Sequence, residues 1–211
     1  MNEINPWSKI PLADYEQHME HQDVGQAQLL NKLTGKYLEK INPENVLFLG
    51  ISGGNGLEHI NTNRVKRVCA IDINDSYLEE TRKRFAGKIK QLDLVNTDID
   101  SSDFSYIQAD FVWAALILEY VDMIRFFDFI KANTQPTCKL LVTIQSNNGV
   151  QSVSTTGIES VKSVGSIFKI IEKEDLLTRA GMFGFECSGL EENFLPNGKS
   201  LLTYEFSKNA I

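Results

Sequence analysis

The chain has 211 residues, of which 42% are hydrophobic and 23% are charged, and its net charge at pH 7 is −7. This length predicts one domain with a single core, and the balance of residue types excludes a disordered, collagen-like or coiled-coil protein. The acidic balance argues against nucleic-acid binding, which depends on Lys and Arg neutralising phosphates. We therefore expect no nucleic acid partner; a local basic groove is the alternative, but no basic run stands out.

The cysteines and the N-terminus favour a cytoplasmic protein. Cys69, Cys138 and Cys187 are odd in number, widely spaced and set in apolar segments, as expected for reduced core residues. Residues 1–6 lack the basic and apolar regions of a signal peptide. No apolar run reaches the roughly 20 residues of a membrane span, so no membrane partner is expected.

Residues 1–43 are predicted to form an arm and a helix that cover a sheet and its pocket, within one structural domain completed by residues 44–211. Residues 1–24 lack clean periodicity and predict an irregular arm or a short helix. From residue 26 to residue 41, apolar side chains recur every three or four positions, which indicates an amphipathic helix ended by Asn42 and Pro43.

The stretch from residue 44 to residue 60 organises the rest of the chain. The unbroken apolar run at residues 46–49 predicts the central strand of a parallel sheet, and a helix is expected from about Asn55. Four glycines lie between them: Gly50, Gly53, Gly54 and Gly56. A glycine-rich turn from a strand to a helix lets a ligand approach bare backbone.

Charge and spacing indicate what that ligand is. The glycines do not have the G-x-G-x-x-G spacing of a dinucleotide site, no Lys or Arg lies between Gly50 and Ile60, and Glu58 would repel a phosphate. The next apolar strand, residues 68–72, ends in Asp72, where a carboxylate can bind both hydroxyls of a ribose. A ribose without phosphates predicts an adenosyl group; the alternative for Asp72 is a helix N-cap.

The remaining elements alternate between helix and strand. Asp75 or Ser76 can cap a helix that reaches Phe85, and Asp122 can cap a second one that carries Ile124, Phe127 and Ile130. A third helix, residues 172–181, is expected to end at Gly181. Strands are predicted within residues 89–97, at 110–115 and 139–144, and as an antiparallel pair at 183–190 and 201–206 joined by Pro196-Asn197-Gly198.

Residues 145–165 are rich in Ser, Asn, Gly and Thr and are too long and polar for a simple connection. We expect this segment to close an acceptor pocket together with the arm around Tyr15–Met19. The alternative is a disordered surface loop without a role.

Four of these segments, in this order, resemble class I S-adenosylmethionine-dependent methyltransferases over roughly residues 44–207. They are the glycine loop from Gly50 to Gly56, Asp72, the pair Asp98-Ile99, and residues 110–121, D-F-V-W-A-A-L-I-L-E-Y-V. The resemblance implies an α/β fold: a Rossmann-like doubly wound seven-stranded sheet, mostly parallel, with an antiparallel C-terminal hairpin strand. This sequence departs from the family's pattern at Phe48, where many members carry an acid, and at Glu119-Tyr120, where His-His is more usual.

The resemblance also implies a cofactor site for S-adenosylmethionine, with S-adenosylhomocysteine as the product. Its expected residues are Gly50, Ile51, Ser52, Gly54, Gly56, Asp72, Ile73, Asp98, Ile99, Ala114 and Ala115. Asp98 has an alternative role as the cap of the next turn. Asp110, which precedes its strand, is expected to be structural.

Candidate catalytic residues are Tyr15, His18, Glu119 and Tyr120, and the alternative for each is a packed, hydrogen-bonded side chain. No metal site is predicted. The resulting hypothesis is in-line methyl transfer to a small-molecule acceptor. An amide or nucleobase amine is disfavoured, because no Asn/Asp-Pro-Pro-Tyr sequence follows the fourth strand. The alternatives are a non-catalytic cofactor-binding or interaction protein and, less favoured, an NAD-dependent oxidoreductase; a homodimer is left open.

Overall fold

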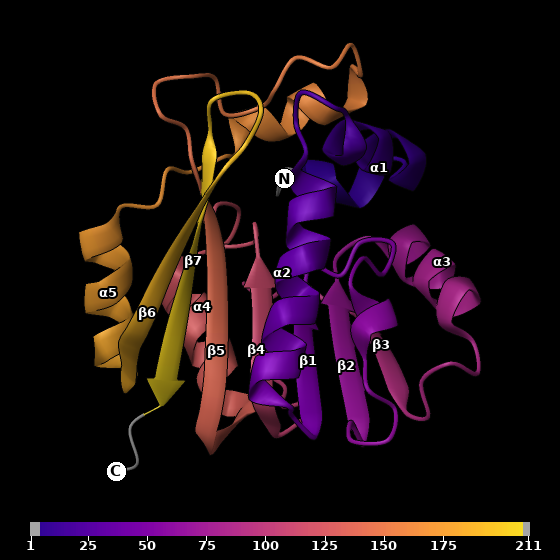
Figure 1. Cartoon of the computed structure of the whole chain (residues 1–211), viewed down its shortest axis with the longest axis vertical. Coiled ribbons are helices and arrows are strands. Elements are labelled where there is room, and N and C mark those ends of the chain that lie inside the picture. Colours follow the sequence, from indigo (N-terminus) through magenta and orange to yellow (C-terminus); the bar gives the residue numbers. More distant parts are fainter. Residues whose placement is uncertain (1–4, 209–211) are drawn as a thin grey trace.

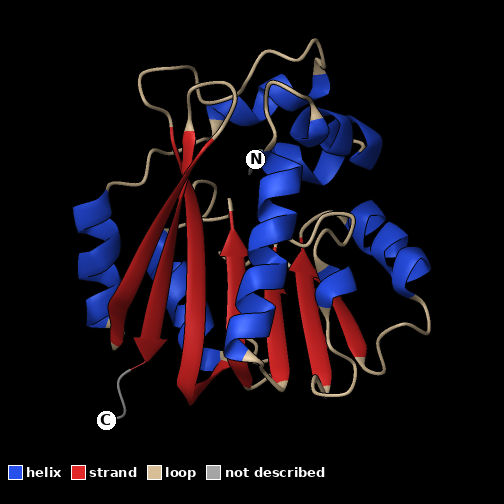
Figure 2. Cartoon of the chain, in the orientation of Figure 1, coloured by secondary structure: helices blue, strands red, loops and turns tan. Residues whose placement is uncertain are grey.

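A computed structural model describes residues 5–208 and contains one seven-stranded sheet in the order β3-β2-β1-β4-β5-β7-β6 (Figures 1 and 2). The strands are β1 (Asn45–Leu49), β2 (Arg67–Asp72), β3 (Leu92–Asn96), β4 (Ala109–Ala115), β5 (Thr134–Ser146), β6 (Phe185–Phe194) and β7 (Ser200–Lys208). Only β7 pairs antiparallel, with β5 and β6. The predicted Rossmann-like fold with an antiparallel C-terminal hairpin is confirmed.

Helices cover both faces of this sheet (Figure 1). They are α1 (Leu12–Glu20), α2 (Gln26–Ile41), α3 (Asp75–Phe85), α4 (Met123–Ala132) and α5 (Lys173–Met182), with short 3-10 helices η1 (Pro6–Lys9), η2 (Leu57–His59) and η3 (Ser160–Ser166). Alternate residues of the strands supply the two cores. Val46 and Phe48 of β1 pack with α2, and Leu47 and Leu49 pack with the side of α4 and α5.

The middle position of the sheet belongs to β4, with β1 beside it, so the prediction that β1 is central was wrong by one strand. The cause is the C-terminal hairpin, which adds two strands beyond β5. β4 is flanked by β1 and β5 in parallel register, and its residues Phe111, Val112 and Ala114 are fully buried. The turns that follow β1 and β4 are therefore neighbours.

The helix expected from Asn55 is absent from the described chain; the turn η2 takes its place. Gly56 enters η2 with φ 92°, and the side chain of Asn61 accepts a hydrogen bond from the Asn63 backbone N–H. Asn side chains compete in this way with helical hydrogen bonds. This local bonding lies directly after η2, where a single turn stands in place of the expected helix.

Smaller corrections concern helix ends and faces. The cap of α3 is Asn74, whose side chain accepts from Ser76 N, so neither Asp75 nor Ser76 caps it. Asp122 does cap α4, but Ile124 is 42% exposed because the buried stripe of α4 is turned toward Phe126 and Phe127. Gly181 lies inside α5.

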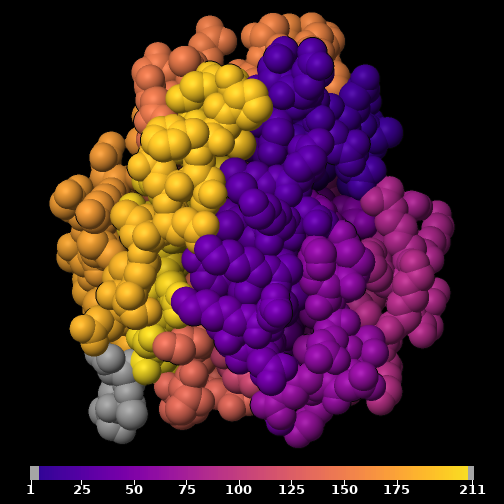
Figure 3. Space-filling view, viewed as in Figure 1, coloured from indigo at the N-terminus to yellow at the C-terminus, as the bar shows by residue number. Residues whose placement is uncertain are grey.

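The N-terminal part packs onto the rest of the chain (Figure 3). Tyr37 of α2 donates a hydrogen bond to Glu191 of β6 at 2.9 Å, and Lys40 pairs with Glu205 of β7 at 2.5 Å. Helix α1 and η3 lie beyond the tips of β2 and β4 (Figure 1). We propose that the part of residues 1–43 that is described acts as a cover of one domain; residues 1–4 lie outside the described residues.

Candidate functional site

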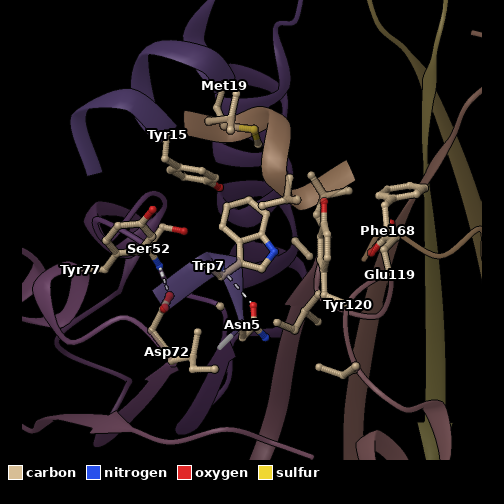
Figure 4. A pocket seen from close by; sticks show the side chains of 18 of the residues that line it. Asn5, Trp7, Tyr15, Met19, Ser52, Asp72, Tyr77, Glu119, Tyr120 and Phe168 are labelled. Atoms are coloured by element: carbon tan, nitrogen blue, oxygen red, sulfur yellow. Dashed lines mark hydrogen bonds between the residues drawn. The ribbon is translucent and has the colours of Figure 1, made fainter. Parts of the chain in front are cut away.

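Two adjoining cavities open where β1, β2 and β4 end. The first, here called the main cavity, has an empty volume of about 1110 Å³ that includes space open to solvent. The second, the glycine-loop cavity, lies against residues 50–55. Tyr15 and Met19 of α1 line both. The site is therefore built between the sheet edge and the N-terminal arm (Figure 4).

Most of the predicted cofactor residues line these cavities. Gly50, Ser52, Asp72, Ile73, Asp98, Ile99 and Ala115 line the main cavity, and Ile51 and Gly54 line only the glycine-loop cavity. Gly56 and Ala114 line neither. A Cβ on Gly56 would lie 2.7 Å from Thr34, so this glycine is required by the packing of α2, and Ala114 is fully buried in the sheet.

The glycine loop is held in place by backbone bonds. Gly50 takes φ 68° and Ser52 takes φ 53°, conformations in the left-handed region that favours glycine. The backbone N–H of Ser52 donates to Asp72 Oδ2 at 2.8 Å, and its carbonyl accepts from the Thr81 hydroxyl at 2.8 Å. These two bonds tie the loop to the end of β2 and to α3.

Asp72 is 8% exposed and accepts from two backbone N–H groups, Ser52 on Oδ2 and Asn74 on Oδ1 at 2.9 Å. Each carboxylate oxygen has a second lone pair for another donor. Burial raises the pKa of Asp72 to about 6, against the lowering effect of these bonds. A buried carboxylate at the cavity wall is suited to receive hydroxyl donors.

Asp98 is half-buried, and its Oδ1 accepts from the Asp100 N–H at 3.0 Å, so it caps the next turn while lining the main cavity. Ile99 beside it is 4% exposed. Asp110 lies outside both cavities and accepts from the backbone N–H groups of Glu44 and Asn45, which fixes the start of β1. This geometry agrees with a structural role for Asp110.

All four candidate catalytic residues line the main cavity. Tyr15 and His18 come from α1, and Glu119 and Tyr120 from the turn after β4. His18 Nδ1 lies 2.8 Å from the Thr156 hydroxyl, and burial, followed by the positive charge of Lys199, lowers the pKa of His18 to about 4. Burial also raises the pKa values of Tyr15 and Tyr120, so both are neutral phenols.

Glu119 is only 1% exposed. Its Oε1 accepts from the Gln145 backbone N–H at 2.7 Å, and its Oε2 has no hydrogen-bond partner. Burial raises the pKa of Glu119 to about 7. At neutral pH this group is poised to gain or lose a proton.

An aromatic wall, not predicted from the sequence, lines the cavity. The ring of Trp7 meets Tyr120 edge-on at 5.1 Å and Tyr15 at 5.8 Å, and Tyr120 meets Phe168 at 5.8 Å. Figure 4 shows the Trp7 ring between Tyr15 and Tyr120. No periodic signal in the sequence marks Trp7 or Phe168, because Trp7 lies in the single turn η1 and Phe168 lies in an irregular segment. Tyr77 has the spacing of an ordinary core residue of its helix.

Polar atoms in this cavity lack partners. In the described chain, five buried side-chain N or O atoms have none, and three of them belong to residues that line the main cavity: Trp7 Nε1, Tyr77 Oη and Glu119 Oε2. Buried polar groups are almost always hydrogen-bonded in native proteins. Their gathering here indicates a site for a polar ligand.

Residues 145–165 meet the arm at the cavity mouth. The Ser160 hydroxyl donates to Asp14 of α1 at 2.6 Å, and Val161 and Val164 of η3 pack with Ile10. Lys199 Nζ, from the turn before β7, donates to the Ser152 carbonyl at 2.6 Å. The segment is therefore ordered against α1.

Within residues 5–208, no group of three or more His, Cys, Asp and Glu side chains is arranged to hold a metal ion. No helix of the described chain combines the length and the apolar character that crossing a membrane demands.

Comparison with known proteins finds one family model that matches part of the chain and solved structures of similar architecture. Residues 47–142 match the family model described as a methyltransferase domain. The N-methyltransferase NodS from Bradyrhizobium japonicum WM9, in complex with S-adenosyl-l-homocysteine, is 14% identical with a TM-score of 0.67, covering 97% of this chain and 99% of NodS. Magnesium protoporphyrin IX methyltransferase (ChlM) from Synechocystis PCC 6803, with bound SAM, is 11% identical with a TM-score of 0.69, covering 96% and 93%.

A third similar structure is that of the [4+2]-cyclase SpnF, 14% identical with a TM-score of 0.67 and covering 87% of this chain and 83% of SpnF. A search of curated proteins found no match. At these identities the structural likeness shows the fold alone.

Proposed function

We propose that this chain transfers a methyl group from S-adenosylmethionine to a small-molecule acceptor by in-line displacement, on the premise that residues 47–142 match a methyltransferase domain and that the fold is shared with solved methyltransferases. S-adenosylhomocysteine is the other product. The observation that carries the proposal is the buried Asp72 at the end of β2, bonded to the glycine loop and lining a cavity with unpartnered polar atoms.

The residues present fit this cofactor. Gly50 and Ser52 offer backbone at the turn, Asp72 offers lone pairs to ribose hydroxyls, and Asp98 with Ile99 offers a carboxylate and an apolar surface to an adenine ring. No Lys or Arg lies between Gly50 and Ile60, which suits a ligand without phosphates. The unpartnered Tyr77 hydroxyl lines the same end of the cavity and is available to a polar ligand group.

When bound, S-adenosylmethionine supplies a methyl group already activated by its sulfonium. The chain has to hold the acceptor in line with that methyl, exclude water and accept a proton. Positioning of this kind can contribute up to roughly 7–11 kcal/mol to lowering the barrier. A positioned base such as Glu119 contributes roughly 10²–10⁴-fold.

The relatives are consistent with a small-molecule acceptor but do not identify it. NodS is named as an N-methyltransferase and ChlM as a methyltransferase of magnesium protoporphyrin IX, whereas SpnF is named as a cyclase. One fold therefore supports different reactions, and the acceptor has to be argued from the site. We place the protein in the cytoplasm, because Cys69, Cys138 and Cys187 are free thiols.

We expect S-adenosylhomocysteine to bind with a micromolar dissociation constant and NAD to bind at least about tenfold more weakly. The glycine spacing does not suit a pyrophosphate, and Glu58, which accepts from the Gly56 N–H, would repel one. Isothermal titration calorimetry with both ligands in parallel measures this order. Tighter binding of NAD would overturn the proposal in favour of an oxidoreductase.

Replacing Asp72 by Ala should weaken binding of S-adenosylhomocysteine by about 1.5–3 kcal/mol, the range for losing a hydrogen bond to a charged group. Calorimetry on the variant gives this difference, and circular dichroism checks that it is folded. The matched control is Asp128→Ala, which removes an exposed carboxylate of α4 away from both cavities. Equal dissociation constants for wild type and Asp72→Ala would remove Asp72 from the site.

A second candidate function is a non-catalytic cofactor-binding protein of the same fold. The observation that favours it is Phe48, which is 1% exposed in β1 and lines the glycine-loop cavity where many members of the family carry an acid. Methyl transfer to an acceptor, followed by mass spectrometry, separates the two functions.

A further inference from the structure

The part of the main cavity beyond the turn after β4 is here called the acceptor half. Its walls come from that turn, from the segment after β5 and from the N-terminal arm. Its residues are Trp7, Glu119, Tyr120, Gln145, Val153, Val161, Val164 and Phe168. Apolar and aromatic side chains make up most of this set, so the acceptor half suits a molecule with an apolar body.

The charged side chains in the cavity lining are acids. Among the described residues that line it there is no Lys or Arg, whereas Asp72, Asp98 and Glu119 are acids. His18, the remaining basic residue there, is neutral because burial lowers its pKa to about 4. An acceptor that carries a carboxylate or phosphate at its reacting end would meet no Lys or Arg in the cavity lining, and the nearby Lys199 Nζ is held by the Ser152 carbonyl and the Ser154 hydroxyl.

Glu119 is the only acid among the residues of the acceptor half, and one of its two carboxylate oxygens has no hydrogen-bond partner. Oε1 is held by the Gln145 N–H, which fixes the orientation of the group, while Oε2 is buried without a donor. Leaving a carboxylate oxygen buried and unpaired is costly, so a ligand that brings an N–H or O–H donor gains by filling the position. An amine in its ammonium form brings three donors and a positive charge.

Aromatic rings close to Glu119 favour a cation further. Tyr120, its neighbour in the chain, contacts Trp7 edge-on at 5.1 Å and Phe168 edge-on at 5.8 Å. Figure 4 shows Tyr120 and Phe168 beside Glu119, with Trp7 on the other side of Tyr120. Cations are attracted to the faces of aromatic rings, most strongly to Trp, and more so in a desolvated site. A carboxylate that accepts hydrogen bonds, together with aromatic faces, suits an alkylammonium group.

We propose that the acceptor is a small aliphatic amine with an apolar body, and that Glu119 binds its nitrogen through Oε2; this inference rests on the proposed methyltransferase function. The apolar body packs against Val153, Val161 and Val164.

Glu119 accepts the proton that the ammonium has to lose before its nitrogen can take the methyl group. The bound ammonium passes one proton to Oε2 of the Glu119 carboxylate, because burial disfavours the charged form of this group. The nitrogen lone pair then forms the new bond to the methyl carbon while the carbon–sulfur bond breaks, and its electron pair stays on sulfur. The products are S-adenosylhomocysteine and a methylated ammonium, and Glu119 later returns its proton to water.

The test is calorimetry on the protein saturated with S-adenosylhomocysteine. Two size-matched series serve as probes: phenethylamine, 2-phenylethanol and phenylacetate, and butylamine, butanol and butyrate. In at least one series the amine should bind about 10- to 100-fold more tightly than the alcohol and the acid, since a hydrogen bond to a charged group is at stake. Glu119→Gln should remove this preference and leave the affinity for S-adenosylhomocysteine within about twofold.

Glu186→Gln, at an exposed carboxylate of β6, is the matched control and should keep the preference for the amine. Equal binding within each series, tighter binding of the acids, or no binding of any probe would overturn the inference. The wild-type series decides this even where Glu119→Gln does not fold. If S-adenosylhomocysteine itself does not bind, the proposed function fails; if it binds and the amine preference is absent, only the inference about the acceptor fails.

Discussion

Between pH 5 and pH 8, the wild-type protein should lose about 2–3 kcal/mol more stability than Glu119→Gln. Burial raises the pKa of Glu119 from its ordinary value of 4.5 to about 7 in the folded state. A group with a raised folded pKa contributes stability that is complete below its unfolded pKa and is lost as the pH rises through its folded pKa. The window for Glu119 is therefore pH 4.5 to about 7, and the magnitude follows from about 1.4 kcal/mol for each factor of ten.

Urea unfolding of both proteins at pH 5 and pH 8 measures this difference. Other buried groups also titrate there: the pKa of Asp72 is raised to about 6, and that of His18 is lowered to about 4. Both groups are present in wild type and variant, so their contributions cancel in the comparison. A difference between the proteins that does not change with pH would show that Glu119 ionises as it does in the unfolded chain.

The ionisation of Glu119 should also depend on a bound ligand. A buried carboxylate without a second partner is costly as an anion, which is why its pKa is raised. A bound ammonium would supply the missing partner at Oε2 and return the carboxylate to its charged form. Glu119 thus links the stability of the empty protein to the acceptor chemistry inferred above.

The sheet edge that carries the site could be predicted from the sequence because it depends on local signals. The apolar runs of β1, β2 and β4 lie within a residue of their predicted positions, and Gly50 and Asp72 follow from where those strands end. In a parallel sheet, strand ends meet at one edge, so residues far apart in the chain share one cavity. This argument needs no knowledge of side-chain packing.

The aromatic and polar parts of the cavity could not be predicted in this way. Trp7 reaches Tyr120 because Asn74, at the start of α3, donates hydrogen bonds to the carbonyls of Trp7 and Ile10 and so fixes the arm. That contact spans more than sixty residues and leaves no periodic trace. The unpartnered Oε2 of Glu119 is likewise a product of tertiary packing, since its partner on Oε1 is the backbone of Gln145.

We propose that residues 145–165 and α1 close over the cavity together. Residues 145–165 contact α1 through few bonds: His18 with Thr156 at 2.8 Å, and Ser160 with Asp14 at 2.6 Å. Segments of this kind open locally at low free energy. Because α1 also lines the cavity with Tyr15, a ligand that fills the cavity should favour the closed arrangement.

We therefore expect amide hydrogen exchange in residues 147–165 and in α1 to slow by up to about 100-fold when S-adenosylhomocysteine is present at about 100 times its dissociation constant, which is the limit set by linkage. Amides of α4, which lies behind the sheet, serve as the internal reference. Asp14→Ala, which removes the bond to Ser160, should reduce the added protection, whereas Asp23→Ala, at an exposed acid beyond α1, should not. Exchange that the ligand leaves unchanged in both segments would show that they are a fixed wall of the cavity, because a lid that closes over a bound molecule has to open more rarely while the molecule is there.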